Sequence, residues 1–247
     1  MSDIPRNKSE KTTFPTGIFF VVILIVAVGL FFLSKAIFKR HDSSVPRTNI
    51  TPIDGVAATF TPKAFIDLHS YFNGSLKTNW MSHAAYMQDR NLADLPAGVN
   101  VFNGSTFRVD GLLQLQGAVM KREHRKFPEQ IDGIPVGLKC SGLHFLQGTG
   151  WSVTDGSQIA AYIIHFADGT QIEFPVLYGT DVRDWNYYPD DKFKATNAAW
   201  SSQQHSVYFR IYASTWHNPK PDLVVKSLDF VSLVTGCAPF CLGITAE

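Results

Sequence analysis

Hydrophobic and polar positions follow three different patterns along this chain of 247 residues. Residues 17–33 (GIFFVVILIVAVGLFFL) contain no charged or strongly polar side chain. Residues 41–59 are polar, hold two prolines and show no period. From residue 60 onward, short apolar segments are separated by Gly, Asn-Gly and Asp-Gly turns, which is typical of β-strands. The pattern therefore predicts an apolar helix, a polar linker and a β-rich domain.

The apolar segment predicts a transmembrane helix at residues 14–38. With its flanking residues it reaches the about 20 positions that span a bilayer core. A cleaved signal peptide usually has a shorter apolar region followed by small residues, whereas the basic KAIFKR follows here. We therefore expect an uncleaved anchor, preceded by a tail at residues 1–13 and followed by a stalk at residues 39–59.

The orientation of this anchor is only weakly determined by charge. Basic residues flank the segment on both sides: Arg6, Lys8 and Lys11 before it, and Lys35, Lys39 and Arg40 after it. The positive-inside rule therefore hardly discriminates between the two orientations. Because a short N-terminal tail usually accompanies an exported domain, we expect the C-terminal domain on the periplasmic or extracellular side. A cytosolic domain is the alternative.

Residues 60–247 are expected to form one all-β domain, an antiparallel β-sandwich of jelly-roll type. Two strands meet across Asn103-Gly104, a strong tight-turn dipeptide. Residues 159–166 (IAAYIIHF) are apolar on both faces and predict a central strand. Asp168-Gly169 is expected to supply the positive φ angles of the next turn, and Pro175 predicts an edge strand or a bulge. Residues 80–95 predict a short helix or an irregular crossing.

Composition excludes some functions and leaves the cysteines open. The formal net charge of +1 argues against nucleic acid as a partner, because phosphate binding needs concentrated Lys and Arg. Cys237 and Cys241 lie four residues apart, and Cys140 is remote. Without clustered histidines this spacing does not predict a zinc site. We expect buried thiols, and one disulfide from Cys140 to either partner is the alternative.

Four stretches of the domain carry a resemblance to a known module. They read FNGSTFRVDGLLQLQG, FPEQIDGIPVGLKCSGLHFLQGTGW, IAAYIIHFADGTQIEFPVLYGTDVRDWNYYP and STWHNPKPDLVVKSLDFVSLVTGCAPFCLGITAE. The sequence resembles the galactose-binding-like jelly-roll module that follows membrane segments in many planctomycete and verrucomicrobial proteins. YGTDVRDW and TWHNPKPD are its most specific parts. The resemblance implies a fold and a membrane-associated context, and no established ligand. Kinase or sigma-factor regions often precede that module, and here we expect the module alone on its anchor.

The stretch YGTDVRDW provides the first candidate site. Asp181, Arg183 and Trp185 alternate, so on an extended strand they share one face, with Asp184 on the other. An indole beside a carboxylate and a guanidinium suits a sugar, since the ring packs on C–H groups and the charges bind hydroxyls. The alternative is structural: Arg183 pairs with Asp181 or Asp184, and Trp185 belongs to the core.

A second loop is expected to complete this site. TWHNPKPD places Trp216, His217 and Asn218 on a loop stiffened by two prolines. The segment WNYYPDD adds Tyr187 and Tyr188, and we expect both loops to line the same end of the sandwich. These residues form the predicted ligand-binding site. The alternative is that the prolines only set the path between two strands.

Catalysis and metal binding have weaker support. The histidines are scattered without an HExxH pair, and no G-x-S-x-G elbow is present. Asp190 and Asp191 offer oxygen ligands for a structural Ca²⁺, although no D-x-D-x-D-G loop exists. No catalytic residue or cofactor is therefore assigned, and metal ligands stay open.

The function that these patterns favour is a single-pass, membrane-anchored binding or sensing module without catalysis, with a carbohydrate as its ligand class. A protein-interaction or assembly module of the cell envelope is the first alternative. A glycoside or ester hydrolase using Asp181, Asp184 or His217 is the second, and the separation of the two aspartates along the chain does not fix the distance between their carboxyl groups.

Overall fold

The structure, a computed structural model, describes residues 64–82, 84, 87, 89–187, 198–204 and 206–247. The chain divides into two units, Met1–Ala58 and Thr59–Glu247, and the described residues all lie in the second. The expected membrane segment at residues 14–38 and the stalk at residues 39–59 fall outside them. In the part of the chain that is described, no helix has the length and apolar character needed to cross a bilayer.

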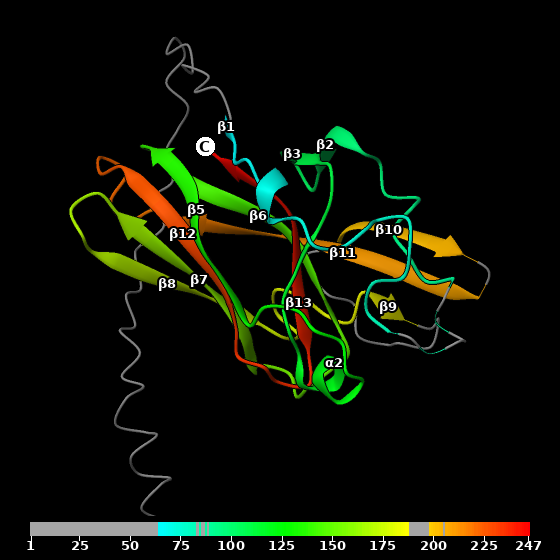
Figure 1. The fold of residues 1–247 in the computed structure, drawn as a ribbon. Coiled ribbons are helices and arrows are strands. Elements are labelled where there is room, and N and C mark those ends of the chain that lie inside the picture. Colours follow the sequence, from blue (N-terminus) through cyan, green and yellow to red (C-terminus); the bar gives the residue numbers. More distant parts are fainter. Residues whose placement is uncertain (1–63, 83, 85–86, 88, 188–197, 205) are drawn as a thin grey trace, which may run out of the picture. The chain divides into compact units, whose positions relative to one another are not determined.

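The larger of two main antiparallel sheets has the strand order β1-β13-β6-β11-β10, with β4 paired to β13 and β9 paired to β11. Its strands are β1 (Ala64–Phe65), β4 (Leu113–Gln114), β6 (Gly142–Gly150), β9 (Asn186–Tyr187), β10 (Ala198–Gln204), β11 (Val207–His217) and β13 (Ala238–Ala246). A short 3-10 helix, η1 (His69–Tyr71), follows β1. The strands β13 and β6 lie in the middle of this sheet (Figure 1).

The smaller sheet has the order β5-β12-β7-β8. Its strands are β5 (Gln130–Leu138), β7 (Gln158–Phe166), β8 (Gln171–Leu177) and β12 (Val225–Ser232). Aromatic rings join the two sheets: Tyr162 on β7 stacks on Phe145 of β6 with ring centroids 4.0 Å apart, and on Phe230 of β12 at 4.6 Å. The expected antiparallel β-sandwich is therefore present.

A third layer covers the other face of the larger sheet. It consists of the hairpin β2 (Gly98–Phe102) and β3 (Ser105–Val109), the helix α2 (Ala118–Arg122) and the chain from Trp80 to Leu95. The described residues of that chain are turns, bends and irregular backbone, with 3-10 geometry at Met87. The expectation there was a short helix or an irregular crossing, and residues 83, 85, 86 and 88 lie outside the described part of the chain. Because apolar side chains cover both faces of the larger sheet, every residue of β6 and β13 is buried.

Local turn chemistry agrees in part with expectation. Asn103 (φ 49°) and Gly104 (φ 81°) both have positive φ, as the tight turn between β2 and β3 requires. The loop between β7 and β8 is different, because only Gly169 has a positive φ (84°) and the Phe166 N–H donates to Thr170 O. Gly169 therefore supplies a positive φ as expected, whereas the same expectation for Asp168 is wrong. The strand β7 is central, and β8 with Pro175 is an edge strand, as expected.

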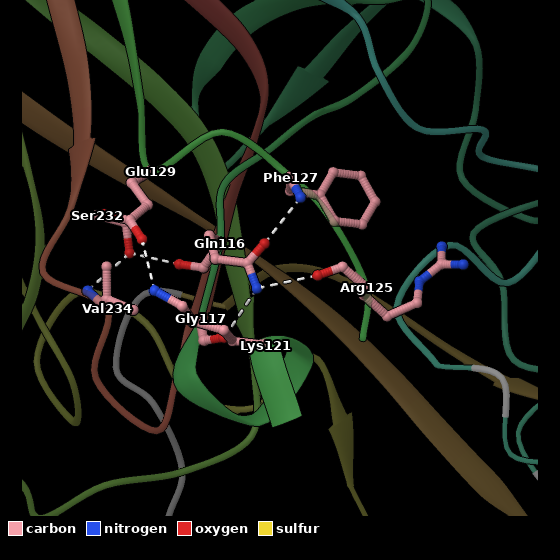
Figure 2. Close-up of polar contacts among 8 residues, drawn as sticks. All are labelled: Gln116, Gly117, Lys121, Arg125, Phe127, Glu129, Ser232 and Val234. Atoms are coloured by element: carbon pink, nitrogen blue, oxygen red, sulfur yellow. Dashed lines mark hydrogen bonds and ion pairs between the residues drawn. The ribbon is translucent and has the colours of Figure 1, made fainter. Parts of the chain in front are cut away.

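The side chain of Gln116 satisfies irregular backbone between β4 and β5 (Figure 2). Its Oε1 accepts from the Phe127 N–H at 2.7 Å, and its Nε2 donates to the carbonyls of Gly117 and Arg125 at 3.3 and 3.2 Å. Its own carbonyl accepts from Ser232 Oγ at 2.6 Å. Buried backbone groups outside regular structure need such partners, so one amide stabilises the path around α2.

The three cysteines are free and buried, in agreement with the expected buried thiols. The alternative disulfide from Cys140 is absent from the structure. Burial raises the pKa of the Cys237 thiol to about 12 and that of Cys241 to about 11. Both side chains therefore stay protonated and pack as small apolar groups.

Candidate functional site

The segment after β8 is a turn and not an extended strand. The backbone N–H of Gly179 donates to Val182 O at 2.8 Å, and Gly179 has a φ of 85°. The carboxylate of Asp181 accepts from the Leu177 N–H at 2.7 Å and so closes the turn. Burial raises the pKa of Asp181. The expectation that Asp181, Arg183 and Trp185 alternate on one strand face is therefore wrong, because Asp181 lies in this turn.

Arg183 has a partner that is remote in sequence. Its side chain is 9% exposed, and a guanidinium nitrogen lies 2.5 Å from Asp155 Oδ2. The guanidinium also lies 5.4 Å from the ring centroid of Tyr178. The interpretation that Arg183 has a structural role agrees with this geometry, but the expected partners Asp181 and Asp184 are wrong.

Trp185 lies in the core of the layer that covers the larger sheet. It is 1% exposed, and its ring centroid lies 4.9 Å from that of Trp80 and 5.0 Å from that of Phe209. Neighbouring rings therefore occupy the faces that a sugar would need. The alternative expectation, that Trp185 is a core residue, describes this position.

Two of the three site residues predicted on the second loop, Trp216 and Asn218, are buried. Trp216 belongs to the core between the two main sheets, 6.4 Å from the ring of Phe166. Asn218 is buried, and its Nδ2 donates to Cys140 O at 2.9 Å. His217, the last residue of β11, is exposed. Asn218 therefore stabilises the chain after β11.

The two predicted loops lie at opposite ends of β11. Trp185 O accepts from the Arg210 N–H at 2.8 Å, near the start of the strand, whereas Trp216 pairs with Leu143 near its end. At a rise of about 3.3 Å per residue the two positions are roughly 20 Å apart. The expectation that both loops line the same end of the sandwich is therefore wrong.

Some expected site residues lie outside the described part of the chain. These are Tyr188 and the two aspartates expected to favour Ca²⁺, Asp190 and Asp191. Where residues are described, no group of three or more His, Cys, Asp or Glu side chains is placed to hold a metal ion.

A cavity of about 300 Å³ opens beside two predicted residues, Asp184 and Trp185. Its polar and aromatic lining comes from Arg90, Trp151, Asp184 and Asn186, and its apolar lining includes Met81 and Met87. We call this space the Asp184 cavity. Trp185 and Gly150 complete its wall. Tyr187 follows Asn186 in the short strand β9.

Strand pairing brings these residues together at the end of β6. Asp184 forms a parallel bridge with Thr149, and the Trp185 N–H donates to Thr149 O at 2.8 Å. Trp151 follows β6 with a φ of 60°, which is unusual for a bulky side chain. Gly150 admits the covering layer, because a Cβ there would lie 2.5 Å from Met81 Sδ.

The carboxyl of Asp184 is the titratable centre of this cavity. Burial raises its pKa to about 7, although the Asn186 N–H and the positive charges of Arg210 and Arg90 favour ionisation. Arg210 is held nearby, because its Nε donates to Asp184 O at 2.9 Å and its guanidinium lies 4.1 Å from the ring centroid of Tyr187. Near neutral pH the carboxyl therefore exists in both protonation states.

Sequence patterns did not indicate most of this cavity. Met81, Met87 and Arg90 come from the irregular crossing, and Trp151 follows a strand with no motif around it. An aromatic residue directly after a glycine-containing strand end was the one visible signal. Only the tertiary fold brings these residues to Asp184.

A second cavity, of about 480 Å³, lies where the described chain begins. Phe65, Asp67, His69, Phe72, Arg108 and Asp110 are among its lining residues. The guanidinium of Arg108 lies 5.4 Å from the ring centroid of Phe65 and 3.9 Å from the Asp110 carboxylate. Among the predicted site residues that the structure describes, none lines it.

In comparisons with known proteins, no family model and no curated protein matches this chain. The candidate function is therefore argued from the chain's own site, centred on Asp184.

Proposed function

We propose that this chain is a membrane-anchored binding module, and that its Asp184 cavity binds a carbohydrate without hydrolysing it. One observation carries the proposal: residues that bear an indole, a guanidinium, a carboxyl and an amide line the same cavity, namely Trp151, Arg90, Asp184 and Asn186. These groups come from three separate segments of the chain, so the fold assembles them.

The lining suits the two kinds of surface that a sugar presents. The half-buried indole of Trp151 and the thioether of Met81 provide apolar contact for C–H groups. The carboxyl, amide and guanidinium provide donors and acceptors for hydroxyl groups. A volume of about 300 Å³ lies at the lower end of small-molecule sites, which favours a single sugar unit.

The proposal of binding without glycoside hydrolysis at this cavity is supported by the carboxyl groups around it. Glycoside hydrolysis by the usual mechanisms needs two carboxyl groups on opposite sides of the bond. Among the described lining residues, Asp184 is the only Asp or Glu. Asp181 is not a second one, because its carboxylate accepts from the Leu177 N–H in the preceding turn.

The cellular context is part of the proposal and rests on the sequence. The uncharged segment 17–33 and the basic residues around it support a membrane anchor at residues 14–38. The resemblance to galactose-binding-like jelly-roll modules supports a binding role in the cell envelope.

Glycan-array binding followed by calorimetry on the full-length chain tests the proposal. We expect Trp151→Ala and Asp184→Asn to weaken binding at least about tenfold, as for central contacts of a binding site. Arg122→Ala and Asp222→Asn change exposed residues outside the cavity and serve as controls. A folded protein that binds no glycan, or binding unchanged in both cavity variants, contradicts the proposal.

A second candidate function, an assembly module of the envelope, is favoured by one observation. Val99 and Val101 on β2 are 53% and 67% exposed, and in the described structure β2 pairs only with β3. Such an edge can accept a further strand from a partner. In-membrane cross-linking that yields one stoichiometric partner, and that Val101→Lys abolishes, supports this function. Cross-linking that is unaffected by Val101→Lys contradicts it.

A further inference from the structure

A hydroxyl, an imidazole and a carboxylate meet at the end of the larger sheet remote from Asp184. His144 on β6 lies at the centre of this group. Its Nδ1 is 2.8 Å from Thr215 Oγ1 on β11 and 3.2 Å from Ser105 Oγ on β3, and its Nε2 is 2.6 Å from Glu247 Oε2. The three strands and the residue after β13 thus contribute one connected set of polar side chains.

Strand register fixes the members of this group. His144 is paired directly with Thr215 on one side and with Thr245 of β13 on the other. Directly paired residues point to the same face of a sheet. The backbone of Glu247 is fixed by two hydrogen bonds. Its backbone oxygen accepts from Ser141 Oγ at 2.7 Å, and its N–H donates to Gly142 O at 3.1 Å. The geometry therefore depends on the sheet and not on a free loop.

The contacts define which nitrogen of His144 carries the proton. A carboxylate only accepts hydrogen bonds, so the nitrogen facing Glu247 is the N–H donor. In the neutral ring the opposite nitrogen, Nδ1, is then an acceptor, and the Thr215 hydroxyl donates to it. This is the arrangement in which an imidazole acts as general base toward a hydroxyl while a carboxylate orients the ring.

We propose that Thr215 Oγ1 is a nucleophile, activated by His144 and oriented through Glu247, for acyl transfer from carboxylic esters. Thr215 is an exposed residue, whereas His144 is 8% exposed. The Glu247 side chain is 47% exposed, so the group lies at the surface. Ser105 approaches the same nitrogen at a longer distance and positions the ring from the hairpin side.

The proposed reaction consumes an ester and water and yields an alcohol and a carboxylic acid. Thr215 Oγ1 forms a bond to the acyl carbon while its proton passes to His144 Nδ1. The carboxylate of Glu247 stabilises the imidazolium that forms, and the ring then gives its proton to the departing alkoxide. Water attacks the acyl-threonine by the same route, which releases the carboxylic acid and restores the hydroxyl.

This site is separate from the Asp184 cavity. His144 and Gly150 lie six residues apart on β6, which corresponds to roughly 20 Å along the strand. Activity at one site and binding at the other are therefore independent, and the failure of either proposal leaves the other open to its own test.

Labelling of the full-length chain by a fluorophosphonate probe, with the modified residue identified by mass spectrometry, tests the proposal. We expect the probe on Thr215 and slow release of p-nitrophenolate from p-nitrophenyl acetate. His144→Gln and Thr215→Val are expected to lower both rates at least about a hundredfold, the usual share of general-base catalysis. Glu247→Gln is expected to lower them less.

Matched variants separate the chemistry from folding. Thr154→Val removes an exposed threonine hydroxyl elsewhere and is expected to keep the label. If Thr215→Val fails to fold, Thr215→Ser supplies the readout, because it keeps the hydroxyl and is expected to react. A folded chain that takes no label, a label on another residue, or labelling unchanged in His144→Gln overturns the proposal.

Discussion

A guanidinium nitrogen of Arg183 lies 2.5 Å from Asp155 Oδ2, so that the turn after β8 is tied to the loop before β7. Gly179 makes room for this contact, because a Cβ at that position would lie 2.8 Å from the Asp155 carboxylate. The ion pair thus closes the corner of the sandwich on the side where the chain continues to Asp184.

Arg183→Met is expected to lower the free energy of unfolding by about 1–3 kcal/mol, because the charged hydrogen bond is lost and its neighbours stay buried. Asp155→Asn is expected to cost less, since its side chain is 54% exposed. Urea unfolding followed by circular dichroism measures both. Asp110→Asn is the control, because its pair with Arg108 is long and exposed. Equal effects of Arg183→Met and Asp110→Asn contradict the assignment.

Asp184 is expected to make stability depend on pH. Its pKa of about 7 lies above the roughly 3.9 of an unfolded chain. Between these values the folded state holds a proton that the unfolded state has lost, so the free energy of unfolding falls as pH rises. The slope contributed is at most about 1.4 kcal/mol per pH unit. Between pH 4 and 8 the free energy of unfolding is expected to change less with pH in Asp184→Asn than in the unsubstituted chain. The same pH dependence in both proteins contradicts the raised pKa.

Trp151 allows backbone strain and ligand contact to be separated. Its φ of 60° is costly for any residue with a Cβ. Trp151→Gly is therefore expected to be about 1 kcal/mol more stable than Trp151→Ala, measured by thermal unfolding. Both variants lack the indole, so both are expected to lose glycan binding. Equal stability of the two variants is the outcome that contradicts a strained backbone here.

Gln116 is expected to be among the most sensitive polar positions. Gln116→Leu leaves the partly buried Phe127 N–H without its acceptor, at a cost of about 2–4 kcal/mol once the other bonds are included. Hydrogen exchange is expected to accelerate at Phe127 in particular. Gln130→Ala, at an exposed glutamine on β5, is the control and is expected to change stability by less than about 0.5 kcal/mol. A Gln116→Leu effect as small as that of the control sinks this expectation.

Local features of the fold could be predicted because short-range sterics determine them. The turn at Asn103-Gly104 needs positive φ angles, and Pro175 cannot donate to a neighbouring strand. The third layer was not predicted. The strand β6 mixes His144 and Gln147 with apolar residues, and its pattern does not tell which segment covers its second face.

The site was less predictable for the same reason. The alternation around Asp181 is interrupted by a turn that Gly179 permits, and Arg183 finds its partner 28 residues earlier. Asp184 was singled out from the sequence, whereas Trp151 and Arg90 reach it only through strand pairing and the covering layer. Side chains that converge from distant segments leave no periodic signal.

The central position of β13 has a consequence for synthesis of the chain. The strands β6 and β1 pair with β13, yet β13 begins at Ala238 and β6 begins at Gly142. At about 5–20 residues per second, a ribosome needs roughly 5 to 20 s to pass from one to the other. During that interval the nascent chain carries an open, apolar strand edge. Chaperone binding to β6 on the ribosome would protect it until β13 arrives.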